Sequence, residues 1–479
     1  MRKNVALTTI VIALLVYAYL KRVNLNLSAG DQWVYFAASH LFVDGILPYR
    51  DFFFSHAPLQ VLLSALLVKM GASLSILSLL SAFICGLSAL LLFFLVRERA
   101  GIARALVSFL LFLFSYANLI GSLYYTGQEL GLLLFLLGLF FFLRQKKLIA
   151  GILAGLSVCA SINILVNAFV LVLFQFFWNK KKLPKLLAGM AGSFGLIHLV
   201  FTLIAGGAFW RQVYLYHLAK PDESTRLAGS GKVFLFMGNA HSFLLILALA
   251  GAILLWLGWR RGNFEEEPER QKLLLLSTAL VLGQILFLTY IRPIFPHYFL
   301  PIAPFAAILA AEALVTGGEY VLRFWKKRDY ARSILPAGIL CTLLVWSTVH
   351  TLRFYRIEQI LLGVPHAEEV AAAVREAIPE DATIFGEFGI APLISLLSDR
   401  RLAGNEVDTS EMRIFSGETT LDAFIKIIEE DNVQILVNRE LRGINAYPPF
   451  WKYRDRHFFL ARTFKASGYP TVIELWKRK

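Results

Sequence analysis

Residues 73–122 read SLSILSLLSAFICGLSALLLFFLVRERAGIARALVSFLLFLFSYANLIGS. Two apolar runs, 73–96 and 105–122, flank the basic segment 97–104. Each run is about as long as a helix must be to cross roughly 30 Å of hydrocarbon. We therefore predict two membrane spans joined by a short basic loop.

The rest of the chain repeats this pattern. Of its 479 residues, 57% are hydrophobic and 17% are charged, whereas a soluble domain is about 25% charged. We predict a mainly α fold, a polytopic transmembrane helix bundle of about eleven spans. The predicted spans are 5–20, 73–96, 105–122, 128–143, 148–162, 164–178, 186–206, 234–258, 273–290, 298–317 and 334–351. The first run lacks a small-x-small cleavage site, which favours an uncleaved span over a secretory signal.

The net charge of +14 is explained by clusters of Lys and Arg between the spans, and not by a nucleic-acid partner. Five alternate loops are basic, which by the positive-inside rule makes them cytoplasmic. These loops are 97–104, 144–147, 179–185, 260–272 and 323–333. We predict a multi-pass protein of the plasma membrane, with a cytoplasmic N-terminus and a first outer loop at 21–72.

The chain changes character after the last predicted span. We predict a transmembrane domain at 1–351 and an extracytoplasmic α/β domain at 352–479. In the second domain, amphipathic helical runs alternate with β-branched runs. We expect helices at 366–378, 391–399 and 420–432, and strands at 381–387, 433–438 and 471–477.

The first outer loop is rich in acidic and aromatic residues. Asp31 follows the first span by about ten residues and should lie near the membrane–water boundary. The run 33–43, WVYFAASHLFV, has the spacing of a helix in that interface, and 56–73 resembles a second one. Two such helices would form a lid over a cavity between the spans, with Asp31 at its edge.

This arrangement fits the transfer of a lipid-carried group to an acceptor outside the cell. A carboxylate can take the proton of an acceptor hydroxyl as it attacks an anomeric carbon, and a cation can stabilise the departing phosphate. The candidate base is Asp31. The candidate cations on the outer face are Arg50, His56, Arg211, His217, Lys220, Arg226, Arg292 and His297.

The stretch 31–59, DQWVYFAASHLFVDGILPYRDFFFSHAPL, resembles the first outer loop of the GT-C glycosyltransferases. The most similar members are relatives of dolichyl-phosphate-mannose protein mannosyltransferase and of the lipid A aminoarabinose transferase. The segment 292–312, RPIFPHYFLPIAPFAAILAAE, resembles a second family segment that includes His297 and Tyr298. In the first loop the matching residues are Gly45, Pro48, Tyr49, Arg50, Asp51, His56 and Pro58.

The resemblance implies sugar transfer from a polyprenyl-phosphate donor to a lipid, glycan or protein acceptor at the lipid bilayer. It also implies that Asp31 is catalytic, and Asp51 is the second candidate catalytic residue, with a role at the substrate. The sequence departs from the family at two places. Its acidic pair is Asp31-Gln32 and not Asp-Glu, and the apex at 160–163, ASIN, has no lysine.

Structural alternatives stand beside these roles. Asp31 could cap the helix that follows, and Asp51 could pair with Arg50 in a turn. Glu129 could cap the helix of the fourth span or contact the donor or a metal. The cations Arg211, Lys220 and Arg292 could simply anchor helix ends at the interface.

Some relatives use a divalent metal, but no His/Asp/Glu cluster here has ligand spacing, so we predict no metal ligands. The cysteines Cys85, Cys159 and Cys341 are isolated within apolar runs and predict no disulfide framework. The alternative functions are a transporter or flippase and a non-catalytic assembly protein for lipid-linked envelope glycans. Transport is disfavoured because the predicted spans contain almost no charged residues.

Overall fold

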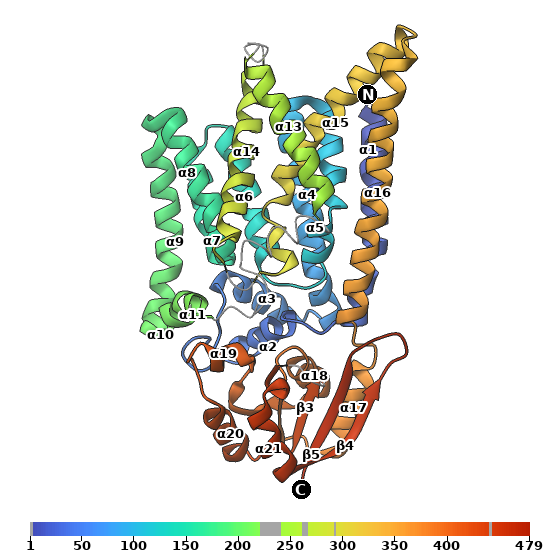
Figure 1. The fold of residues 1–479 in the computed structure, drawn as a ribbon. Helices are drawn as coiled ribbons and strands as arrows, with labels where there is room; N and C mark the ends of the chain where they lie inside the picture. Colours follow the sequence, from blue (N-terminus) through green and yellow to red (C-terminus); the bar gives the residue numbers. More distant parts are fainter. Residues whose placement is uncertain (1–2, 221–240, 261–266, 292–293, 440–442) are drawn as a thin grey trace.

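The computed structural model of the chain describes residues 3–220, 241–260, 267–291, 294–439 and 443–479. These residues form a bundle of long helices with a small mixed sheet at one end (Figure 1). Among them, seven helices are long and apolar enough to cross a membrane. The chain is therefore an integral membrane protein with a mainly helical fold, as its sequence predicts.

Among the described residues, a helix lies within every predicted span range. Three of these helices, α6, α7 and α8, have only 16, 14 and 15 residues, so the number of eleven spans stays a prediction. The bundle helices are α1 Lys3–Lys21, α4 Leu74–Leu113, α5 Tyr116–Gly121, α6 Gln128–Leu143, α7 Lys147–Ala160, α8 Leu165–Asn179, α9 Leu183–Ala205, α13 Ser242–Arg260, α14 Pro268–Leu288, α15 Ala303–Lys326 and α16 Tyr330–Leu362.

The opening stretch forms α4, which contains both predicted spans. Gly101 interrupts it with a φ of 84°, a left-handed conformation that glycine adopts without a Cβ penalty. The rings of Phe93 and Phe109, eight residues on either side, lie 6.5 Å apart. In a straight helix they would be about 24 Å apart, so α4 folds back on itself at the basic loop.

The predicted cytoplasmic loops meet at the end of the bundle opposite the sheet, which we call the inner end (Figure 1). Arg144 forms an ion pair with Glu98, and Arg99 forms one with Glu269. These four residues come from three different basic loops. Their contacts support the predicted topology, in which those loops share one side of the membrane.

The opposite, outer end carries the two short helices predicted in the first loop. They are α2 Gln32–Val43 and α3 Pro58–Lys69, and they lie between the bundle and the C-terminal domain (Figure 1). Other short elements at this end are η1 Arg22–Asn26, α10 Gly207–Trp210, η4 Arg211–Leu215, α11 Tyr216–Ala219 and η5 Pro296–Phe299.

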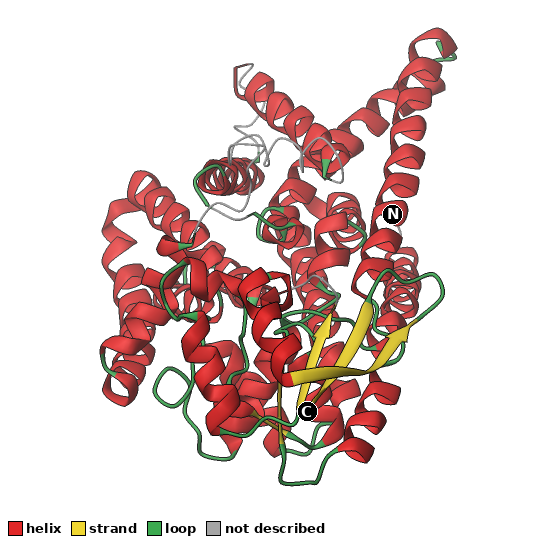
Figure 2. Cartoon of the chain, turned by 60° about the horizontal axis from the view of Figure 1, so that its bottom comes forward, coloured by secondary structure: helices red, strands yellow, loops and turns green. Residues whose placement is uncertain are grey.

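The C-terminal domain is a five-stranded mixed sheet with the order β2-β1-β3-β5-β4 (Figure 2). Strands β2, β1 and β3 are parallel, and β5 and β4 are antiparallel to their neighbours. The strands are β1 Thr383–Gly386, β2 Arg401–Leu402, β3 Ile435–Arg439, β4 Phe458–Lys465 and β5 Val472–Arg478. The helices are α17 Ala367–Ala377, α18 Ala391–Ser398, α19 Glu411–Phe415, α20 Leu421–Glu430 and α21 Pro448–His457.

Successive residues of a strand point to opposite faces of a sheet, and both faces here are covered. Ile384 packs on the face that meets α17 and α18, whereas Phe385 packs on the face that meets α20 and α21. The hydrophobic cluster that contains Ile384 also contains Phe36 of α2. The core of the C-terminal domain is thus continuous with the first outer loop.

Candidate active site at the outer end

Immediately before Asp31, backbone hydrogen bonds join the first outer loop to the end of α16, to the segment that follows α16 and to the C-terminal domain. We call this contact the seam. Its three bonds run from Ala29 N–H to the Leu362 carbonyl (2.6 Å), from Val364 N–H to the Leu27 carbonyl (3.2 Å) and from Gly30 N–H to the Gly389 carbonyl (3.2 Å). Because these bonds are backbone contacts, they fix the position of the chain on which Asp31 is carried.

Asp31 immediately precedes α2 and is half-buried, but its side chain makes no capping hydrogen bond. The structure therefore gives no support to the alternative of a helix cap. Within the described residues, its carboxylate also makes no other hydrogen bond and no ion pair within 4 Å. Burial raises the pKa of Asp31 to about 6, with a further contribution from Asp408 and an opposing one from Lys220.

Three tyrosines lie near this carboxylate. Burial raises the pKa of Tyr35, Tyr124 and Tyr298, and the charge of Asp31 raises it further in all three. Tyr35 lies one helical turn after Asp31 on α2. The predicted site residue Tyr298 is thus brought close to Asp31 from a distant part of the chain.

The candidate histidines are hydrogen-bonded to phenol or carbonyl groups. The Nδ1 atom of His56 lies 3.0 Å from the hydroxyl of Tyr35, and that of His297 lies 2.8 Å from the hydroxyl of Tyr124. Burial lowers the pKa of His56 well below its usual value and that of His297 to about 3. Both rings are therefore neutral at pH 7 and can serve as hydrogen-bonding groups, not as the cations that the sequence suggested.

Arg50 and Asp51 lie on an exposed turn of the first loop. Their side chains form an ion pair with a distance of 2.8 Å between Arg50 Nε and Asp51 Oδ1. Asp51 Oδ2 also accepts a hydrogen bond of 2.8 Å from Leu47 N–H. This geometry corresponds to the structural alternative, so we leave both residues out of the proposed reaction.

Glu129 is fully buried in the first turn of α6. Its carboxylate accepts hydrogen bonds from the backbone N–H groups of Thr126 (3.1 Å) and Gly127 (3.4 Å). These bonds satisfy donors at the start of a helix, as the capping alternative predicted.

The remaining predicted cations differ in their partners. Arg211 Nη2 lies 3.2 Å from Glu418 of the C-terminal domain, so it links that domain to the end of the bundle. The ammonium group of Lys220 lies 4.6 Å from the ring centroid of Tyr216, and its charge acts on Asp31. Arg226 and Arg292 lie outside the described residues.

The C-terminal domain contributes charged residues that the sequence did not identify. Glu387 is fully buried and receives two hydrogen bonds from Arg439, at 2.8 and 2.5 Å. The two residues stand at the carboxyl ends of β1 and β3, and both charges act on Asp31. The available signal was that one predicted strand ends at Glu387 and that Arg439 directly follows the next, because the carboxyl ends of parallel strands meet at one edge.

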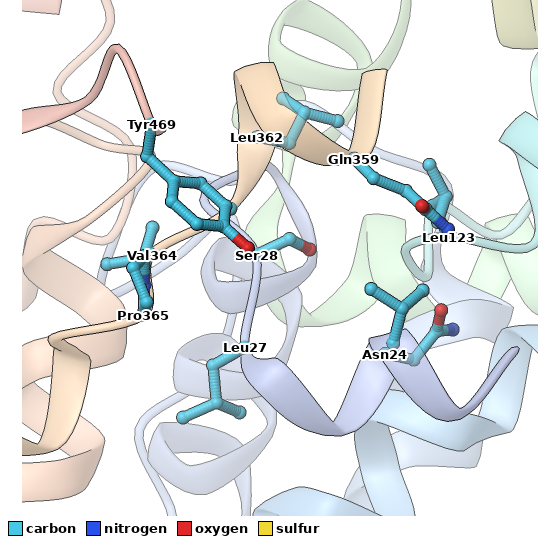
Figure 3. Close-up of a pocket in the computed structure, with 11 residues that line it drawn as sticks. Asn24, Leu27, Ser28, Leu123, Gln359, Leu362, Val364, Pro365 and Tyr469 are labelled. Atoms are coloured by element: carbon cyan, nitrogen blue, oxygen red, sulfur yellow. The ribbon is translucent and has the colours of Figure 1, made fainter. Parts of the chain in front are cut away.

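A cavity of about 290 Å³ lies beside the seam (Figure 3). Leu27 and Ser28 line one side of it, and the ring of Tyr469 points toward Ser28 from the C-terminal domain. Asp31 is not among the lining residues, and none of them is charged. Among the residues that the structure describes, no three His, Cys, Asp or Glu side chains are grouped so that they could hold a metal ion.

No family model and no curated protein matches the sequence. Solved structures do match its fold. ArnT from Cupriavidus metallidurans, in a crystal structure bound to undecaprenyl phosphate, matches with a TM-score of 0.66 and 13% identity over 99% of this chain and 98% of that chain. The Archaeoglobus fulgidus oligosaccharyltransferase in its apo form matches with a TM-score of 0.60 and 13% identity over 92% of this chain and 70% of that chain.

The archaeal enzyme AglB in complex with an inhibitory peptide and a dolichol-phosphate also matches, with a TM-score of 0.56 and 15% identity. That match covers 100% of this chain and 74% of the other. Similarity at this level of identity concerns the fold alone. The resemblance drawn from the first loop is confirmed at that level: the chain has the GT-C fold of these membrane glycosyltransferases.

Proposed function

We propose that this protein is an inverting glycosyltransferase that uses a polyprenyl-phosphate sugar as its donor. The acceptor is a hydroxyl group at the extracytoplasmic face of the membrane, and Asp31 is the general base. One observation carries the proposal: in a GT-C fold, Asp31 has no structural partner among the described residues and keeps a pKa of about 6. A base of that strength is mostly ionised at pH 7 and can still accept a proton.

In the proposed reaction the acceptor oxygen attacks the anomeric carbon from the side opposite the phosphate. A new glycosidic bond forms, and the bond from the anomeric carbon to the phosphate oxygen breaks with its electron pair on the phosphate. The acceptor proton passes to the Asp31 carboxylate. The sugar consequently reaches the acceptor with an inverted anomeric configuration.

The cation beside Asp31 suits the leaving group. Lys220 is close enough for its charge to act on Asp31 and on His56, and a lysine can stabilise negative charge that grows on a departing phosphate. The neutral ring of His56 and the hydroxyls of Tyr35 and Tyr298 offer hydrogen bonds to sugar hydroxyls.

The nature of the donor follows from two considerations. The bundle supplies apolar surface for an isoprenoid chain, since seven of its described helices are long and apolar enough to span a membrane. The two proteins of the same fold were solved with undecaprenyl phosphate and with a dolichol-phosphate. We therefore propose a polyprenyl phosphate and not a nucleotide as the sugar carrier.

Purified protein in liposomes, supplied with a panel of polyprenyl-phosphate sugars and membrane extract as the source of acceptor, tests this function. We expect one donor to be consumed and a glycosylated lipid, glycan or protein to be identified by mass spectrometry. The product should be absent with Asp31→Asn. Donor that crosses the liposome membrane without being cleaved would instead support a flippase, and donor consumption that survives Asp31→Asn would exclude the proposed base.

A further inference from the structure

The charge of a second carboxylate acts on Asp31 from the other side of the seam. Asp408 of the C-terminal domain is 7% exposed, and its Oδ1 atom accepts a hydrogen bond of 3.0 Å from Ser410 N–H. The next residue, Thr409, donates its hydroxyl to the carbonyl of Gly386 at the end of β1. Asp408 is thus fixed against the sheet, and its side chain is not a freely moving surface group.

The sheet edge that holds Asp408 also holds the residue before Asp31. Gly386 ends β1, and three residues later the carbonyl of Gly389 accepts the 3.2 Å hydrogen bond from Gly30. Short hydrogen-bonded steps therefore connect the two carboxylates, and no flexible linker separates them. Their relative position is set by the docking of one domain on the other.

Two further contacts hold the segment around Asp408 on the outer end of the bundle. The guanidinium of Arg413 lies 4.1 Å from the ring centroid of Phe53 in the first loop. Arg413 also donates to the backbone carbonyl of Asp408. Together with the ion pair of Arg211 and Glu418, these contacts fix the segment 408–418 from both sides.

We propose, on the basis of the function proposed above, that Asp408 is a positioning residue of the reaction. It places a second carboxylate opposite Asp31 when the C-terminal domain is docked, and this keeps Asp31 a good proton acceptor. The C-terminal domain then contributes directly to the chemistry, because the base reaches its working strength only in the assembled protein.

The neighbouring charges single out Asp408 for this role. Glu387 is neutralised by Arg439, whereas the Asp408 carboxylate has no cation within 4 Å among the described residues. A nearby like charge disfavours ionisation and raises the affinity of Asp31 for a proton. The groups that act on Asp31 or are acted on by it are Asp408, Glu387, Lys220, Arg439, Tyr35, Tyr124 and Tyr298.

The test measures the protonation of Asp31 without any substrate. Dicyclohexylcarbodiimide reacts with protonated carboxyl groups in apolar surroundings, so the pH midpoint of Asp31 labelling, followed by peptide mass spectrometry, reports its pKa. We expect a midpoint near pH 6 for the unchanged protein. Asp408→Asn should shift it to lower pH, Lys220→Met should shift it to higher pH, and the exposed control Asp422→Asn should leave it unchanged.

Asn at position 408 keeps the oxygen that accepts from Ser410, so the fold should survive, and Asp408→Ser provides a second variant. If the reagent does not reach Asp31, the pH dependence of the melting temperature, measured with and without Asp31→Asn, yields the same midpoint. An identical midpoint in the Asp408 variants and the unchanged protein would overturn the inference. It would leave the proposed function intact, because that function is tested by the consumption of the donor and by the activity of Asp31→Asn.

Discussion

Two carboxylates at opposite ends of the helical bundle, Glu312 and Asp31, have opposite surroundings. At the inner end, Glu312 accepts hydrogen bonds from Arg104 (2.8 Å) and Arg270 (3.1 Å), and its side chain is 4% exposed. At the outer end, Asp31 has no such partner among the described residues. A buried carboxylate that is fully paired serves the fold, whereas one left unpaired weakens the fold and is available for chemistry.

The largest expected effect is the loss of catalysis on neutralising the unpaired carboxylate. Asp31→Asn should reduce sugar transfer by roughly 10²–10⁴-fold, because the amide cannot accept the acceptor proton. The rate of product formation in liposomes measures this change. Glu312→Gln, assayed at a temperature where it is folded, should retain most of the rate, and equal losses in both variants would remove the distinction between the two ends.

Substitution of the paired carboxylate, Glu312, tests the inner end of the bundle. Glu312→Gln removes the buried carboxylate that Arg104 and Arg270 share, whereas the ion pair of Arg270 with Glu267 remains. Breaking a buried pair in this way costs about 3–5 kcal/mol of stability. Thermal or denaturant unfolding in detergent measures the loss.

The matched control for that loss is Glu269→Gln. Glu269 pairs with Arg99 at the same end, but its side chain is 50% exposed. An exposed pair contributes no more than about 1 kcal/mol, so this variant should unfold nearly like the unchanged protein. A similar loss in the two variants would show that burial does not distinguish the pairs.

A third prediction concerns pH. Since burial raises the pKa of Asp31 to about 6, the reactive carboxylate is lost below that pH. The value of kcat/KM should therefore fall about tenfold per pH unit below pH 6 and level off above pH 7. A profile that is flat between pH 5 and 7 would contradict the assignment of Asp31 as the base.

The same pKa predicts a change in stability with the opposite sign. The folded-state pKa of Asp31 lies above the usual value of 3.8, so the folded protein binds the proton more tightly than the unfolded chain. The contribution of Asp31 to stability is present below about pH 4 and is lost as the pH rises through 6. We subtract the melting temperature of the unchanged protein from that of Asp31→Asn at each pH. This difference should be larger at pH 8 than at pH 4.

Length and hydropathy were sufficient to predict the apolar helices of the bundle, the basic loops at one end of it and the two helices of the first outer loop. These features depend on local composition and on the thickness of the membrane. The strands that end at Gly386 and Arg439 were also predicted, because buried parallel strands have continuous apolar runs. The edge strand β4 was missed, since five of its eight residues are exposed in succession and give no alternating pattern.

Fewer residues of the site could be predicted from the sequence. Asp408 and Arg439 approach Asp31 only because one domain docks on another, and no local pattern encodes that contact. The charge state of His56 could not be predicted either, because burial among aromatic rings decides it. Sequence could therefore supply a candidate base but not the groups that would set its strength.

The smallest expected effect belongs to the ion pair of Arg50 and Asp51, which matches the family pattern yet lies on an exposed turn. Arg50→Ala and Asp51→Asn should each change stability by less than about 1 kcal/mol, because solvent screens such a pair. Product formation should change no more than a few-fold. A loss of activity with Asp51→Asn as large as that with Asp31→Asn would return Asp51 to the reaction. It would also show that a carboxylate with a cationic partner can take part in the reaction. The comparison of the paired Glu312 with the unpaired Asp31 predicts that it does not.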